Sequence, residues 1–157
     1  NMAVGSSLTL ENPPNKKYKG ESSHALINGM GGTINYQDKS WQGFEAEDLI
    51  AIIDLGSAKT INAVEVRFLQ SQVFWIFLPY HIQIEHSSDG KNFELIYEDF
   101  PSNNFSFEQK IISYKANLGP LESRFIRVKG YNIDQCPDYH PGAGGPSWIF
   151  SDEIIIN

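Results

Sequence analysis

Through much of the chain after residue 48, apolar residues occupy every second position and polar residues lie between them, a pattern typical of half-buried β-strands. Between residues 61 and 70, for example, Val64 and Val66 alternate with Glu65 and Arg67. Residues 49–55 are apolar on both faces, which predicts an interior strand. Altogether the pattern predicts strands at residues 49–55, 61–70, 80–86, 93–98, 106–114, 124–129 and 147–156, and a short one near residues 8–10.

Turn signals separate these segments and indicate the fold class. The run Ser88-Asp89-Gly90-Lys91 places a glycine where a hairpin turn needs a positive φ, so the strands on either side are predicted to pair. No segment has the period of a helix longer than about two turns. Seven or eight short strands joined by glycine- and proline-bearing turns predict one all-β domain, a sandwich or a barrel.

Three stretches interrupt the strand pattern and are candidates for function. Residues 71–79 and 131–146 are longer and more aromatic than a simple connection requires, and loops on a β scaffold often carry function. Residues 25–44 hold too many glycines for a helix interior or a regular strand. Asn28, Thr33 and free carbonyls in such a coil are suited to wrapping a hard cation. The alternative is a glycine turn packed under a loop.

Composition limits the classes of partner. The formal net charge of −7 and a pI of about 5.0 argue against nucleic acid or an anionic membrane surface. A single cysteine, Cys136, excludes an internal disulfide and a zinc site of several thiolates. No apolar run approaches the roughly 20 residues of a membrane span, and residues 1–20 do not resemble a signal peptide. Residues 1–17 are interpreted as a cloning junction (residues 1–3) and an extended lead-in, within a longer natural chain.

Short motifs in a fixed order give the chain a family resemblance. They are Ala-Leu-Ile-Asn-Gly (25–29), Trp41, Ile-Asp-Leu-Gly (53–56), Ser-x-Asp-Gly-x-x-Phe (87–93), Arg-Phe-Ile-Arg-Val (124–128) and Asp-Glu-Ile (152–154). Together they resemble the discoidin domain, also called the coagulation-factor 5/8 type C domain, whose bacterial sugar-binding members form carbohydrate-binding module family 32. Trp-Ile-Phe-x-Pro (75–79) and Cys-Pro-x-x-His-x-Gly-x-Gly (136–144) are similar to modules at the C-terminus of bacterial β-hexosaminidases. The resemblance covers residues 18–157 and implies a jelly-roll-like antiparallel β-sandwich.

The resemblance also implies a structural calcium ion between the glycine-rich loop and the last strand. The implied ligands are backbone carbonyls of Ala25, Met30, Thr33 and Asp152, the side-chain oxygen of Asn28, and the Glu153 carboxylate. Such an all-oxygen set is what calcium prefers. The family usually has aspartate where this chain has Asn28, so a weaker site is expected. The alternative is a loop without calcium, or with sodium, in which Glu153 accepts backbone amide hydrogen bonds.

A glycan site is expected where aromatic rings lie beside amide, acid or guanidinium groups. The candidates are Trp41, Gln42 and Phe44, then Gln70, Gln72 and Trp75, and finally Asp138, Tyr139 and His140. Galactose-binding relatives typically have a histidine after the first-loop tryptophan and an arginine after the third strand. This chain has glutamines there, so a preference for galactose is not implied. We expect Trp75 or Tyr139 to be the stacking platform, at the same end of the sandwich as the calcium loop; alternatively the tryptophans belong to the core.

The resemblance implies a non-catalytic carbohydrate-binding module of an extracytoplasmic glycoside hydrolase similar to β-hexosaminidases. Its expected partners are a glycan, with a terminal hexosamine or galactose-type sugar as one possibility, and a catalytic domain of the same chain. The alternative is a structural or protein-interaction module that binds no sugar. Enzymatic readings are weaker: the acidic residues of 45–48 are typical of a solvated face, and Cys136 with His140 lacks a third orienting group.

Overall fold

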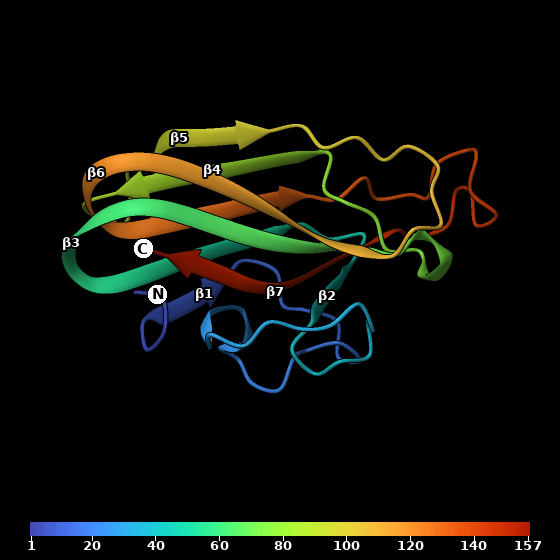
Figure 1. Ribbon diagram of the computed structural model, residues 1–157, viewed down its shortest axis with the longest axis horizontal. Coiled ribbons are helices and arrows are strands. Elements are labelled where there is room, and N and C mark those ends of the chain that lie inside the picture. The colour runs from blue at the N-terminus through green and yellow to red at the C-terminus, as the bar shows by residue number, and fades with distance from the viewer.

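The computed structural model describes residues 1–157 and is built from antiparallel strands (Figure 1). The elements in order are β1 (Ser7–Leu10), η1 (Ala25–Ile27), β2 (Gln42–Glu45), β3 (Leu49–Gln70), η2 (Gln72–Phe74), β4 (His81–Ser87), β5 (Glu94–Asp99), β6 (Lys110–Tyr131) and β7 (Trp148–Ile156). The two η elements are single 3₁₀ turns, and no helix has the length and apolar character needed to cross a membrane. The predicted all-β class is confirmed.

Two long strands make the sandwich. β3 and β6 are 22 residues each, whereas the sequence pattern predicted two separate strands in each region, and that division is wrong. Their pairing continues past a register shift between Asp54 and Lys59, where Gly56 has a φ of 84°. Figure 1 shows the two strands curling over together at the left-hand end, so that one sheet folds into two layers. The turn residues therefore bend the strands without ending them, because each bulged strand keeps its partner.

The strand order across the sheet is β2-β7-β3-β6-β4-β5, with β1 paired to β3. β2 begins within residues 25–44, the stretch that the sequence indicated as coil, and ends one residue beyond it. It has only four residues, including Gly43, and its signal is correspondingly weak. A Cβ at Gly43 would lie 2.6 Å from the ring of Phe150, so glycine is required for this edge strand to pair closely with β7.

The hydrophobic core lies between the two layers. Alternate residues of β3 are buried, such as Ala51 and Ile53, whereas the residues between them are half-buried. The strand predicted to be interior on both faces is therefore buried on one face only. A smaller cluster of Trp41, Leu69, Ile76 and Phe150 packs beside the main core, with Tyr18, Tyr36 and Trp148 against it. This second cluster supports the loops at one end of the sandwich.

The first residues of the chain belong to the packed domain. Ala3 is fully buried in the core, the Met2 N–H donates to the Ile156 carbonyl, and β1 pairs with β3. The segment that the sequence suggested as an extended lead-in thus covers one edge of the sandwich.

Asn132 holds the loop after β6 in place through its buried side chain, a role that the sequence pattern did not indicate. Its buried amide donates to the carbonyls of Phe44, Glu47 and Ser147, and its Oδ1 accepts the hydroxyl of Ser147 at 2.7 Å. Asn132→Ala is expected to lower the free energy of unfolding by about 3 kcal/mol, because it removes the side-chain donor from the Phe44 and Glu47 carbonyls and the acceptor from the Ser147 hydroxyl. Urea denaturation measures this, with the exposed Asn62→Ala as control. An equal, small effect in both variants would contradict the role.

Candidate functional site

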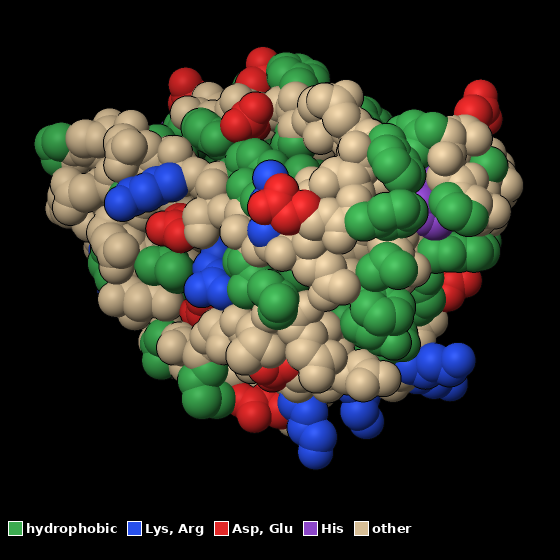
Figure 2. Space-filling model, turned by 45° about the vertical axis from the view of Figure 1, so that its right-hand side comes forward, with side chains coloured by type: hydrophobic (Ala, Val, Ile, Leu, Met, Phe, Trp, Pro, Cys, Tyr) green, Lys and Arg blue, Asp and Glu red, His purple; other side chains and the backbone are tan.

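Exposed aromatic side chains gather at the end of the sandwich opposite the curl of β3 and β6. Loops 71–80, 100–109 and 132–147 meet there, at the right-hand end of Figure 1. Figure 2, in which this end comes forward, shows a patch of hydrophobic side chains on its right-hand part. The exposed rings of these loops include Phe74, Trp75, Phe105, Phe107 and Tyr139. Two of their contacts are edge-on, Phe105 with Phe107 at 4.8 Å and Phe105 with Tyr139 at 5.6 Å between ring centres.

Trp75 is held rigidly in an unusual backbone conformation. Its φ of 65° and ψ of 23° are left-handed, a region that bulky residues seldom adopt and that is enriched at functional sites. Its N–H donates to the Gln72 carbonyl, and its own carbonyl accepts the Trp148 N–H, both at 2.9 Å. The indole lies against Gly142 and Gly145, where a Cβ would come within 2.5 and 2.7 Å of the ring. The side chain nevertheless stays 37% exposed.

Two polar candidates, Gln72 and His140, support this surface from beneath. The buried Gln72 amide donates to the Asn104 carbonyl and accepts the Ser106 N–H. His140 Nδ1 accepts the Gly142 N–H, which leaves Nε2 to donate to the Gln72 carbonyl at 2.7 Å. The His140 side chain therefore connects the loops that carry Trp75 and Tyr139, whereas the Gln72 side chain connects the Trp75 loop to residues 104–106. Both side chains are buried.

Tyr139 and Asp138 are the exposed polar candidates beside the rings. The Tyr139 hydroxyl donates to the Asn103 carbonyl, which fixes its ring over the neighbouring loop. The exposed Asp138 carboxylate makes no hydrogen bond or ion pair within the protein. Of the nine residues predicted to contact glycan, only Trp75, Asp138 and Tyr139 are exposed.

The remaining candidates are buried in the structure, so their side chains are engaged within the fold and offer little surface to a glycan. Phe44 lies in the main core and Trp41 in the smaller cluster, where its Nε1 donates to the Thr33 carbonyl at 2.8 Å. Gln42 and Gln70 donate to the carbonyls of Lys19 and Glu108. The physical reason is that buried carbonyls of irregular loops need donors, which a glutamine or an indole supplies.

The glycine-rich loop and the last strand do share one site, as predicted. The Gly29 N–H donates to Glu153 Oε1 at 3.0 Å, and the Asn1 amide donates to the same oxygen at 3.2 Å. Between the pairs Val66–Ile154 and Phe68–Ser151, β7 holds one residue more than β3. This bulge allows the adjacent Asp152 and Glu153 both to be buried instead of pointing to opposite faces.

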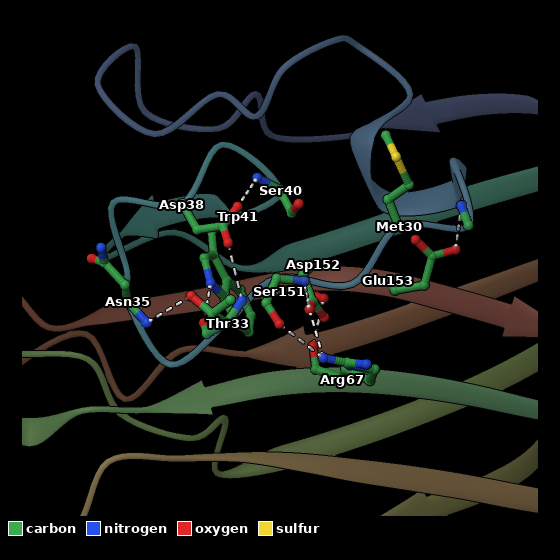
Figure 3. Close-up of polar contacts among 12 residues, drawn as sticks. Met30, Thr33, Asn35, Asp38, Ser40, Trp41, Arg67, Ser151, Asp152 and Glu153 are labelled. Atoms are coloured by element: carbon green, nitrogen blue, oxygen red, sulfur yellow. Dashed lines mark hydrogen bonds and ion pairs between the residues drawn. The ribbon is translucent and has the colours of Figure 1, made fainter.

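The two buried carboxylates are incompletely paired (Figure 3). Asp152 Oδ2 accepts the Gly32 N–H at 2.6 Å and the Arg67 guanidinium at 2.9 Å. Asp152 Oδ1 and Glu153 Oε2 are buried without any hydrogen-bond partner. Burial raises the pKa of Asp152, and burial together with the nearby Asp152 charge raises the pKa of Glu153 to about 7.

Of the other predicted calcium ligands, the Asn28 side chain and the Thr33 carbonyl already have hydrogen-bond partners. Asn28 Oδ1 accepts the Met30 N–H, and its amide donates to Glu21. The Thr33 carbonyl accepts the Trp41 indole, and Figure 3 places Thr33 beside Asp38 and Trp41, away from Glu153. Ala25, the first residue of η1, is fully buried, and Met30 is half exposed.

The aromatic surface and the carboxylate pair are separate, although we expected them at one end. In Figure 1, η1 lies below the left-hand half of the sheet, and the aromatic loops lie at the right. The loop after η1 connects the two places. Its start bonds Glu153, and further along it the ring of Tyr36 lies 4.5 Å from that of Phe74.

Cys136 and His140 do not form a nucleophile and base. The thiol is buried, burial raises its pKa, and its sulfur is directed at the Pro146 carbonyl. Both ring nitrogens of His140 are engaged elsewhere, so neither can take a proton from the thiol.

A shallow groove beside the aromatic rings was missed by sequence reasoning. It has a volume of about 530 Å³ and is lined by Ile34, Asn35, Tyr36, Gln37, Phe74 and Gln109. Residues 34–37 include two amide side chains and one aromatic ring close together in the sequence, and this was the signal that could have indicated the groove. Gln109 could not be found from the sequence, because only the fold brings it to this loop.

Comparison with known proteins identifies the fold. No protein-family profile and no curated protein sequence matches the chain. Among solved structures, chitosan-binding module 1 of a chitosanase/glucanase from Paenibacillus sp. IK-5 aligns with a TM-score of 0.65 at 14% identity, over 100% of this chain and 98% of that one. The Clostridium perfringens module CpGH89CBM32-4, in complex with GlcNAc-α-1,4-galactose, gives 0.61 at 16%, over 100% and 93%. The family 32 module of AlyQ, in complex with 4,5-unsaturated mannuronic acid, gives 0.55 at 17%, over 96% and 93%. The chain therefore has the fold of the discoidin-like family 32 modules.

Proposed function

We propose that this protein is a carbohydrate-binding module whose sugar site is the aromatic surface around Trp75. The observation that carries the proposal is the Trp75 indole, which is rigidly held in a left-handed conformation and yet exposed. A sugar ring has an apolar face that packs on such a surface, and the neighbouring polar groups then bind its hydroxyls.

Two exposed residues supply those polar groups, from the same loop whose His140 and Gly142 contact the indole. The exposed Asp138 carboxylate can accept hydrogen bonds from hydroxyl groups, and the Tyr139 oxygen can accept one while it donates to Asn103. Support also comes from the matched structures, which include modules in complex with chitotriose and with GlcNAc-α-1,4-galactose. An N-acetylhexosamine or galactose-type sugar on a glycoside hydrolase substrate is the ligand class that we propose.

The role that we propose for an exposed sugar site of this kind is to hold an attached enzyme on its substrate. A module of this kind raises the effective concentration of an attached catalytic domain on its glycan. We propose such a domain, similar to β-hexosaminidases, and an extracytoplasmic location. A protein-interaction module is the second candidate, favoured by the size of the exposed aromatic cluster, because such patches also mark protein interfaces.

A glycan array followed by calorimetric titration of the 157-residue chain tests the proposal. The expected dissociation constant is on the order of 0.1–1 mM, about −4 to −5.5 kcal/mol, because a shallow surface excludes little water. Absence of binding to every glycan on the array would reject sugar binding and favour the interaction module.

We also propose that calcium binds at the Glu153 site. Two buried, unpartnered carboxylate oxygens next to a glycine-rich loop are the donors that a hard cation requires. The Glu153 carboxylate and the carbonyls of Ala25, Met30 and Asp152 would hold the ion, and the Asn28 side chain and Thr33 carbonyl would join them by giving up their present hydrogen bonds. When bound, calcium would offset the negative charge of the two carboxylates and tie the loop to β7. Its removal is expected to destabilise the protein.

A further inference from the structure

The groove beside the aromatic surface has the composition of a sugar subsite. Three segments form it: residues 34–37, Phe74 of η2, and Gln109 immediately before β6. It lies outside the residues that the sequence indicated as the glycan site, apart from sharing η2 with Trp75.

Two aromatic rings in the groove are fixed in place. Tyr36 and Phe74 contact each other at 4.5 Å with their planes tilted by 42°. Behind them, Tyr36 packs edge-on against Phe150 at 6.2 Å and against Tyr18 at 5.8 Å. Phe74 remains 46% exposed. The pair therefore offers a supported apolar surface at little cost in side-chain entropy on binding.

Apart from the Tyr36 hydroxyl, the polar side-chain groups of the groove are amides. The side chains of Gln37 and Gln109 are exposed and make no hydrogen bond within the protein, and Asn35 uses only its oxygen, for the Gln37 N–H. An amide carries both a donor and an acceptor, as does a sugar hydroxyl, whereas a carboxylate only accepts and an ammonium only donates. Amides beside aromatic rings thus match a hydroxylated ring that has no charge.

No charged side chain lines this groove, whereas a neighbouring depression is lined by several. That depression, of about 480 Å³, is lined by Lys16, Lys17, Lys19 and Lys39 together with Glu21 and Asp38. An acidic sugar would find no counter-charge in the amide groove and would lose part of its hydration on entering it. The lining therefore favours neutral sugars over uronic acids.

The groove begins where the Trp75 surface ends. Phe74 and Trp75 are consecutive, with Cα atoms about 3.8 Å apart, and their rings face different partners, Tyr36 and the Gly142–Gly145 turn. We propose that the groove is a second subsite continuous with Trp75, and that the ligand is a neutral oligosaccharide of at least two sugar units. This inference rests on the proposed function, and it distinguishes binding along a chain from capture of one terminal sugar.

The test compares chain lengths and charge on the intact 157-residue protein. Calorimetric or NMR titrations use N-acetylglucosamine, chitobiose and chitotriose, then galactose and a galactobiose, with trigalacturonate as the charged probe. The expected result is that a disaccharide binds at least tenfold more tightly than its monosaccharide, and that trigalacturonate gains nothing over a single uronic acid.

Two variants test whether the groove residues cause the higher affinity for a disaccharide. Replacing both Gln37 and Gln109 with alanine is expected to remove the disaccharide's advantage and to leave monosaccharide affinity unchanged. Both side chains are exposed and unbonded, so folding is not at risk. The exposed Asn117→Ala, in the interior of β6, is the matched control and should change neither affinity.

The outcomes separate this inference from the proposed function. Equal affinities for monosaccharide and disaccharide, or a disaccharide advantage that survives loss of both glutamines, would overturn the second subsite while sugar binding stands. If none of these sugars and no glycan on the array binds the protein, both the second subsite and the proposed sugar-binding function are overturned.

Discussion

Trp75→Ala is expected to weaken glycan binding at least tenfold, which moves a millimolar ligand out of the measurable range. The physical reason is that the indole provides the main apolar surface for the sugar ring, and alanine leaves only solvent-exposed backbone above the Gly142–Gly145 turn. Calorimetric titration measures the affinity, and a thermal melt of the same sample reports stability. Because the side chain is already 37% exposed, the loss of stability is expected to be below about 2 kcal/mol.

Two further variants make this result interpretable. Trp75→Phe keeps a ring at the position and is expected to retain part of the affinity. Leu95→Ala removes another exposed hydrophobic side chain, on β5, and should leave binding unchanged. A loss of about 3–5 kcal/mol in the Trp75→Ala melt, typical of a core aromatic, would show that Trp75 is structural and would favour the interaction module.

In the presence of a chelator, the protein is expected to lose about 3 kcal/mol of stability as pH rises from 4.5 to 7. The Glu153 carboxyl has a pKa of about 7 in the folded state, whereas its ordinary pKa is 4.5. Between these values the folded state binds more protons than the unfolded state, so stability falls with rising pH. The magnitude follows from about 1.4 kcal/mol per pKa unit. For a domain of this size the melting temperature should fall by roughly 6–12 °C.

Glu153→Gln removes the titrating group and is the matched control. Its melting temperature should show a smaller decrease with pH over this window. At pH 8, calcium is expected to raise the melting temperature of the natural protein and to have little effect on the Glu153→Gln variant. Parallel pH curves for the two proteins would contradict the role of Glu153, and an unchanged melt on adding calcium at low sodium would contradict the proposed ion site.

Part of the candidate site could be predicted from the sequence. Trp75 and Tyr139 stand in loops that break the strand pattern, and the structure exposes both. Trp41 and Gln42 have the same residue types as binding groups, yet they are buried. Residue type alone could not tell the exposed pair from the buried pair, because an indole or amide can donate to a buried carbonyl as well as bind a sugar.

Local pattern by itself determined the β class, the location of most strand residues after residue 48 and the hairpin turn at Asp89 and Gly90. Side-chain alternation and turn conformations are properties of neighbouring residues, which is why the pattern reveals them. The motif order further indicated the family fold and the meeting of the glycine-rich loop with Glu153. Only the tertiary structure decided that β3 and β6 are continuous, since a bulge is tolerated when the partner strand bends with it. It alone also placed Gln109 beside Tyr36 and left two carboxylate oxygens unpartnered, because such contacts join residues far apart in sequence whose burial depends on the complete fold.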